Sequence, residues 1–131
     1  MPLNVYGTAL EWIEFARNDL ESADYLTNKK PLPLEIICYH CQQCAEKALK
    51  AFLIYSNCDF AKTHDTSLLC AECSKIDSAF QTLLLECASL KNYSVTSRYP
   101  YPIQIEEQDM RKALLDAKTV FEFVQKLLKE N

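Results

Sequence analysis

Glycine is almost absent from this sequence of 131 residues, since Gly7 is its single occurrence. A glycine-rich phosphate-binding loop and a dinucleotide-binding fingerprint both need several closely spaced glycines, so neither can be built here. Proline is confined to positions 2, 31, 33, 100 and 102. Because glycine and proline are the residues that most often interrupt helices, this distribution predicts long helices with prolines at the connections between them.

A basic excess and a long apolar run are also lacking. The net charge of −4 argues against a surface that coats nucleic acid, although it leaves room for a local basic pocket. No stretch approaches the ~18 consecutive apolar residues of a membrane span, and the first residues lack the basic start and apolar core of a signal peptide. We therefore expect one domain over residues 1–131, located in the cytoplasm and not bound to a membrane.

Cysteine, in contrast, occurs seven times. An odd number without an export signal fits reduced thiols better than a disulfide framework. The pairs Cys38-x-x-Cys41 and Cys70-x-x-Cys73 have the spacing of zinc ligands, but structural zinc pairs usually lie on turns, and these lie within helical apolar patterns. Five cysteines have the spacing of a helical core, namely Cys38, Cys41, Cys44, Cys73 and Cys87. We expect buried free thiols, no metal site and no cofactor.

Apolar residues recur at helical spacing in five stretches, which we expect to run over residues 8–28, 34–55, 65–75, 78–93 and 106–129. Thr8 with Glu11 has the spacing of a capping box, and Asp65 or Thr63 is a suitable N-cap for the third helix. Amphipathic helices joined by short connections predict an all-α fold, an up-and-down antiparallel bundle of four main helices plus one short helix.

The segment NYSVTSRYPYPIQI, residues 92–105, is the one stretch expected to be extended, because Pro100 and Pro102 disfavour helix for the residues before them. An arginine beside an aromatic ring is suited to hold a phosphate and stack a base, which makes Arg98 and Tyr99 candidates for ligand binding. Alternatively, the tyrosines only cover the end of the bundle. The residues alone leave both interpretations open.

The stretch from Cys38 to Leu53 combines a broad apolar face with a second, polar face. At helical spacing, the polar face carries His40, Gln43, Lys47 and Lys50. The lysines are either ligand contacts or solvated side chains paired with Glu46 and other acids. The second histidine, His64, stands in the tetrapeptide KTHD. Neither histidine has a serine or cysteine nucleophile at a signature spacing, so an acid–base role competes with a plain structural one for each.

Three pieces in order, WIEFARNDLESADYL, HCQQCAEKALKAFL and KTHD followed later by YSVTSRYP, resemble the HEPN domain family (higher eukaryotes and prokaryotes nucleotide-binding) over Glu11 to about Lys126. The resemblance implies a helical bundle, a homodimer and a partner nucleotidyltransferase in a toxin–antitoxin or defence system. Many members are metal-independent ribonucleases with an arginine followed within a few residues by a histidine. No histidine follows Arg98, so the resemblance is to the non-nuclease branch and implies no catalytic residue.

On this resemblance we expect a non-catalytic module that binds a nucleotide or another phosphate-bearing ligand, through Gln43, Lys47, Lys50, Lys62, His64, Asp65, Arg98 and Tyr99. Two alternatives remain. The first is a metal-independent ribonuclease in which His40 or His64 acts with Arg98 on RNA. The second is a module that serves only dimerisation or protein interaction.

Overall fold

The computed structural model describes residues 5–60, 62–94 and 104–129. The helices are α1 (Val5–Leu26), α2 (Leu34–Tyr55), α3 (Thr66–Ile76), α4 (Leu84–Leu90) and α6 (Glu107–Lys129). Two 3₁₀ helices, η1 (Ser78–Leu83) and η2 (Lys91–Tyr93), flank α4. The described part of the chain contains no strand, so the all-α bundle expected from the sequence is confirmed.

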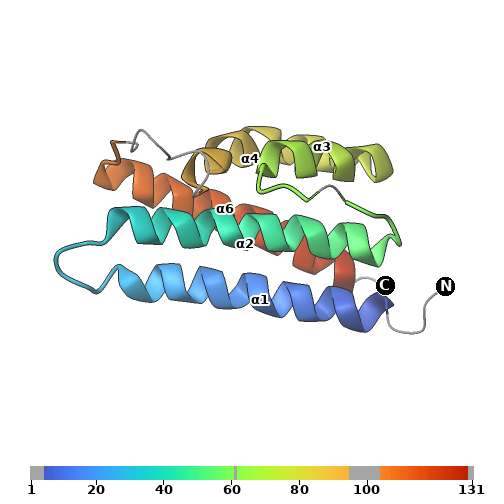
Figure 1. The fold of residues 1–131 in the computed structure, drawn as a ribbon, viewed down its shortest axis with the longest axis horizontal. Helices are drawn as coiled ribbons and strands as arrows, with labels where there is room; N and C mark the ends of the chain where they lie inside the picture. Colours follow the sequence, from blue (N-terminus) through green and yellow to red (C-terminus); the bar gives the residue numbers. More distant parts are fainter. Residues whose placement is uncertain (1–4, 61, 95–103, 130–131) are drawn as a thin grey trace.

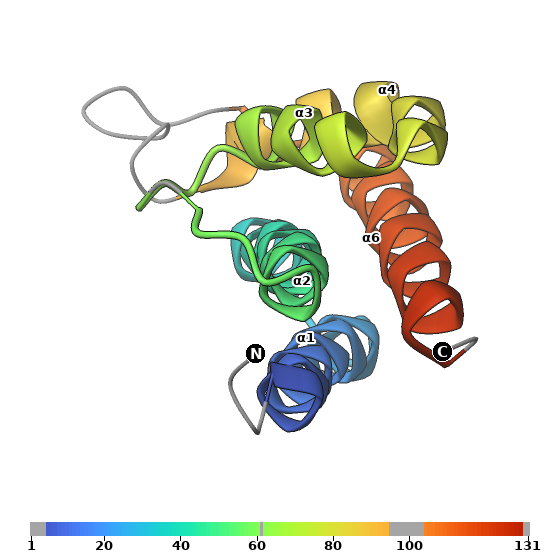
Figure 2. The same ribbon diagram turned by 90° about the vertical axis from the view of Figure 1, so that its right-hand side faces the viewer.

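Helix α2 is the centre of the bundle. It lies antiparallel beside α1, and α6 packs against both of them (Figure 1). Figure 2 looks along α1 and α2 and shows α3 and α4 as a layer above α2 and α6, on the side of α2 that is opposite α1. Since α2 contacts α1, α3 and α6, much of its surface is covered, and several of its polar side chains face α1 or the α2–α3 connection.

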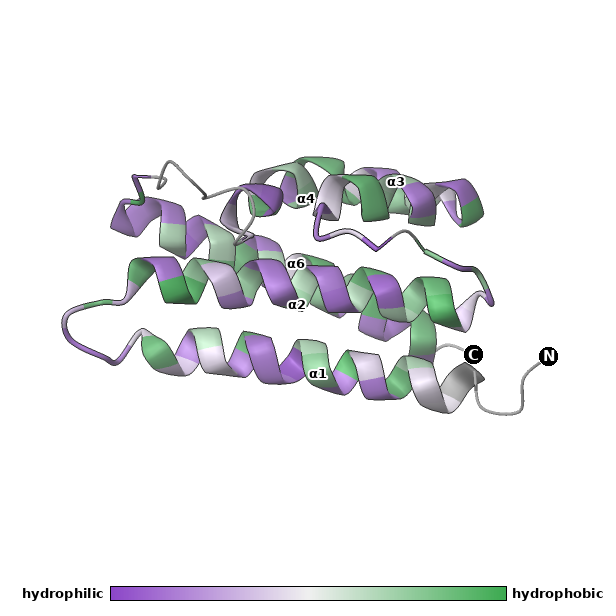
Figure 3. Cartoon of the chain, viewed as in Figure 1, coloured by the Kyte–Doolittle hydropathy of each residue, from purple (hydrophilic) through white to green (hydrophobic). Residues whose placement is uncertain are grey.

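The core forms from the apolar faces that the helical spacing predicted (Figure 3). Six of the seven cysteines belong to it, and Cys58 alone is exposed. Burial raises the pKa of the Cys41, Cys44 and Cys73 thiols, so these groups stay protonated and behave as small apolar side chains. The expectation of buried free thiols is confirmed for the five cysteines named above.

Two details of the helices differ from the prediction. Helix α1 begins at Val5, so Thr8 lies inside it and does not cap it. The stretch expected as one helix over residues 78–93 is a 3₁₀ helix, a short α-helix and a second 3₁₀ turn. Apolar residues three and four positions apart suit either helix type, so the pattern could not separate them. The N-cap prediction for Asp65 is confirmed, because its Oδ1 accepts hydrogen bonds from two backbone N–H groups of α3.

Within the described ranges, no helix is both long enough and apolar enough to cross a membrane. Arg98 and Tyr99, both predicted ligand contacts, lie outside the described residues.

Candidate functional site

A buried carboxylate on α2 organises several of the polar side chains of this helix. Glu46 Oε2 accepts a hydrogen bond from Lys50 Nζ at 2.8 Å. Its Oε1 accepts from the Gln42 and Gln43 amides at 3.1 and 3.3 Å and lies 3.0 Å from His64 Nδ1. We call Gln42, Gln43, Glu46, Lys50 and His64 the Glu46 cluster. It joins α2 to the segment that leads into α3.

The charge state of Glu46 follows from these contacts. Burial alone would raise the pKa of Glu46, but the hydrogen bonds from Lys50, His64 and Gln42 outweigh it and hold this pKa below its ordinary value. An ionised carboxylate only accepts hydrogen bonds, so His64 Nδ1 must carry the proton in this contact. The side chain of Glu46 is 5% exposed and that of His64 is 61% exposed. A buried acid therefore holds an imidazole at the surface.

Lys50 lies on the inner side of the Glu46 cluster. Its Nζ is 5.2 Å from the centre of the Phe60 ring and 5.9 Å from that of Trp12. These two rings also meet each other edge to face, 6.1 Å apart. A buried ammonium needs compensation for the water it has lost, and here one carboxylate and two aromatic faces provide it. Lys50 is therefore covered, and it is not a solvated lysine.

A second carboxylate forms a similar cluster nearer the start of α2. Asp19, on α1, accepts from Lys47 Nζ at 2.7 Å through Oδ2, and its Oδ1 lies 2.9 Å from His40 Nδ1. We call these three residues the Asp19 cluster. Beside it is a hollow of about 490 Å³, lined by Asn18, Glu21, Ser22, Tyr25, Leu26 and His40. The ammonium of Lys47 is directed at Asp19, and this lining includes an acid, so the hollow offers little to an anion.

Contacts at several points fix the connection between α2 and α3, residues 56–65. Asn57, just past the end of α2, has a positive φ of 58° that reverses the chain, and Cys58 N donates to Leu53 O at 2.9 Å. Further along, Phe60 covers Lys50, and Gln42 Nε2 donates to the carbonyl of His64 at 2.7 Å. The Glu46 cluster thus fixes both the backbone and the imidazole of His64.

A hollow of about 460 Å³ opens where this connection meets the η2 turn. Seven residues line it, namely Lys62, Thr63, His64, Asp65, Lys91, Asn92 and Ser94. We call it the cationic hollow, because its lining includes two lysines and a single acid, Asp65, whose side chain caps α3. Positive groups gathered in a concave site attract anions, even in a protein that is acidic overall.

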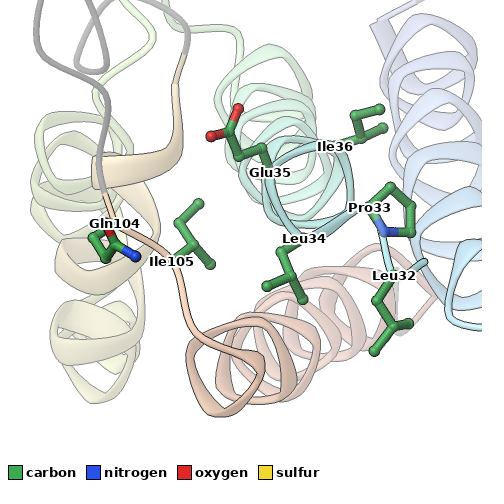
Figure 4. A pocket seen from close by; sticks show the side chains of 7 residues that line it. All are labelled: Leu32, Pro33, Leu34, Glu35, Ile36, Gln104 and Ile105. Carbon is green, nitrogen blue, oxygen red and sulfur yellow. The ribbon is translucent and has the colours of Figure 1, made fainter. Parts of the chain in front are cut away.

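A third hollow, of about 500 Å³, lies at the start of α2 and is lined by Leu32, Pro33, Leu34, Glu35, Ile36, Gln104 and Ile105. Figure 4 shows Leu32 and Leu34 extending toward α6, while Glu35 points away from them. Its lining is largely apolar and its one charged group is acidic. It is therefore unsuited to a phosphate.

The structure divides the six predicted ligand residues that it describes into three groups. Lys62, His64 and Asp65 line the cationic hollow. Gln43 and Lys50 lie behind His64 in the Glu46 cluster, whereas Lys47 belongs to the Asp19 cluster.

Sequence reasoning missed several residues of the site. Asp19 is not among the residues that the sequence analysis singled out, yet it is only 9% exposed and accepts from Lys47. Its position three residues after Ala16 and four before Ala23, both in the core, was the signal for burial. Lys91 follows the buried Leu90, and no pattern in the sequence brings it to the α2–α3 connection.

Comparison with known proteins agrees with this architecture. The HEPN domain model matches residues 9–127, and the chain belongs to this family. A protein of Methanocaldococcus jannaschii named "Putative toxin MJ1304" is 32% identical over 135 residues, covering 91% of this chain and 87% of that protein. The crystal structure of ST0689, described as an archaeal HEPN homologue, has a TM-score of 0.72 at 26% identity and covers 92% of this chain and 97% of its own. The crystal structure of TT1696 from Thermus thermophilus has a TM-score of 0.73 at 25% identity, with 90% and 96% covered.

Proposed function

We propose that the protein is a non-catalytic HEPN module that binds a nucleotide, or another phosphate-bearing ligand, in the cationic hollow. One observation carries the proposal: Lys62, His64 and Lys91, from two separate segments, line the same hollow in a protein of net charge −4. Lysine ammonium groups are common phosphate ligands. The hollow is also large enough for a nucleotide-sized molecule, since ligand sites usually measure about 300–1,000 Å³.

The biological setting that we propose is a toxin–antitoxin or defence system. The support is the family and the name of the Methanocaldococcus relative. In this setting the chain forms a homodimer in the cytoplasm, and a nucleotidyltransferase partner performs the chemistry. Light scattering on the purified protein tests the first part, with twice the chain mass of 15.1 kDa as the expected result. A monomer at all concentrations contradicts it.

Ribonuclease activity is the second candidate, and the Glu46–His64 pair is the observation that favours it. A carboxylate that orients an imidazole is the arrangement by which many enzymes prepare a general base. Arg98, the group that would stabilise charge on the phosphate in this alternative, lies outside the described residues.

A thermal-shift screen with mono-, di- and triphosphates of adenosine and guanosine, and with short RNA, tests both candidates. We expect a nucleotide to raise the melting temperature and RNA to stay intact. Lys62→Ala and Lys91→Ala should each reduce the shift, whereas Lys118→Ala, at an exposed position of α6, should leave it unchanged. RNA cleavage lost in His64→Ala would favour the ribonuclease. No stabilisation by any phosphate compound would reject the binding module and leave the pure interaction module.

A further inference from the structure

We propose that Glu46 is a positioning residue that keeps His64 as a hydrogen-bond acceptor in the cationic hollow, so that the ligand is a phosphate ester carrying a hydroxyl donor. The inference rests on the proposed function and narrows its ligand class. Two sources share this chemistry, a nucleotide with its ribose hydroxyls and a simple sugar phosphate.

The tautomer of His64 is the first step. Nδ1 lies 3.0 Å from Glu46 Oε1, and that carboxylate already accepts hydrogen bonds from Lys50 and Gln42. A carboxylate surrounded by donors has no proton to give, so the imidazole donates from Nδ1. In the neutral ring the other nitrogen, Nε2, is then an acceptor. The His64 side chain is 61% exposed and His64 lines the hollow, so a ligand there can reach Nε2.

The second step is that His64 is fixed in place. Gln42 Nε2 donates to its carbonyl oxygen at 2.7 Å, and the next residue, Asp65, caps α3 with its side chain. Gln42 also donates to Glu46, so one amide holds both the acid and the backbone of the residue that the acid orients. The acceptor therefore stays in place before any ligand arrives, which reduces the ordering that binding requires.

The third step assigns the phosphate and the hydroxyl of the ligand to different side chains of the hollow. The ammonium groups of Lys62 and Lys91 suit the phosphate, whose dianion has only acceptor oxygens. An Nε2 lone pair close to that dianion gains nothing from it. A hydroxyl on the same ligand, however, can donate to Nε2 while the phosphate occupies the lysines. Deoxygenated analogues keep the phosphate for the lysines but lack the sugar hydroxyl that would donate to Nε2, and inorganic phosphate lacks the sugar altogether.

The experiment compares four ligands by calorimetry at neutral pH: AMP, its 2′,3′-dideoxy analogue, ribose 5-phosphate and inorganic phosphate. We expect AMP to bind about fivefold to tenfold more tightly than the dideoxy analogue, the value of one hydrogen bond. The difference should shrink in Glu46→Gln, disappear in His64→Ala and stay unchanged in Lys118→Ala. Ribose 5-phosphate equal to AMP would support the inference with the sugar phosphate as the recognised part. Weaker binding of ribose 5-phosphate, with the dideoxy effect intact, would support it with a nucleotide.

The nitrogen chemical shifts of His64 give a second readout that a merely structural role of Glu46 would not move. With only two histidines in the chain, each signal can be assigned from a single substitution. We expect the neutral His64 ring to carry its proton on Nδ1, and Glu46→Gln to mix the two tautomers. The matched control Asp19→Asn should alter the His40 signals only.

Two results would overturn the inference and leave the proposed function intact: equal affinity for AMP and its dideoxy analogue, or a proton on Nε2 of neutral His64. If neither these four ligands nor any nucleotide of the thermal-shift screen binds, the proposed function itself fails, and the inference fails with it.

Discussion

The Glu46 cluster and the Asp19 cluster use the same groups in different surroundings. In each, a carboxylate contacts a lysine ammonium and the Nδ1 atom of a histidine. The Asp19 cluster joins two packed helices, and its lysine side chain is 27% exposed. The Glu46 cluster joins a helix to a connection, and its lysine side chain is only 9% exposed. A buried ammonium and an exposed imidazole thus occur together in the Glu46 cluster but not in the Asp19 cluster.

This difference shows why residue types alone do not define a site. In the Asp19 cluster every charged group is satisfied between α1 and α2, and the neighbouring hollow contains an acid. In the Glu46 cluster the charges beneath the surface are also satisfied, but they hold an imidazole beside two further lysines. The first arrangement stabilises the helix pair. The second places a polar group where a ligand can meet it.

The largest effect should come from Glu46→Ala, which leaves Lys50 buried without its carboxylate. Breaking a buried ion pair from one side costs roughly 3–5 kcal/mol of stability. Urea unfolding followed by circular dichroism measures this loss. The matched control is Glu122→Ala at an exposed position of α6, which should change stability by less than about 0.5 kcal/mol. Equal, small losses of stability in both variants would contradict the burial of the Glu46–Lys50 ion pair.

A smaller effect is expected from Phe60→Ala, which uncovers Lys50 and one edge of Trp12. Loss of one ring from this contact should cost about 1–2 kcal/mol. Trp12 is the only tryptophan, so its emission should shift to the red as water reaches it. Phe60→Leu keeps an apolar cover without an aromatic face, so its stability and emission should lie between those of the wild type and Phe60→Ala. An unchanged emission spectrum in Phe60→Ala would place Phe60 away from Trp12 in solution.

Asp19→Ala should cost less than Glu46→Ala, about 1 kcal/mol. The reason is that Lys47 and His40 are both partly exposed and can turn to water when their acceptor is removed. The same unfolding measurement gives the value. A loss as large as that of Glu46→Ala would mean that the two clusters are equally desolvated.

The smallest effect is the pH dependence that Glu46 itself contributes. Folding lowers the pKa of Glu46 from an ordinary value of 4.5. At a pH between the folded and the unfolded pKa, the folded protein therefore binds fewer protons than the unfolded chain. The contribution is present above about pH 4.5 and is lost as the pH falls through the folded pKa. Stability measured from pH 6 to pH 3 should therefore fall less steeply in Glu46→Gln than in the wild type. Parallel curves would contradict this assignment.

Much of the fold could be predicted from periodicity, because the helices bury one face each. The bounds of α2 and the cap at Asp65 are examples. The start of α1 was mispredicted because a helix tolerates threonine in its first turns when apolar neighbours continue the pattern. The site was less predictable. Helical spacing placed Lys47 and Lys50 on one face, with Lys50 four residues after Glu46, but the contact of Lys47 with Asp19 depends on how α1 packs.

Contacts between segments far apart in the sequence account for the parts of the site that the sequence did not predict. The approach of Lys91 to Lys62 is set by the layer of α3 and α4 over α2, which no local pattern encodes. The burial of Lys50 likewise depends on Phe60 returning over α2.

The most direct test is a titration of the protein with AMP, followed through the ring signals of its two histidines. If the Glu46 cluster serves the ligand site and the Asp19 cluster serves the helix pair, the His64 signals should shift and those of His40 should stay in place. Shifts of His40 without shifts of His64 would contradict the account, because the ligand would then occupy the other cluster.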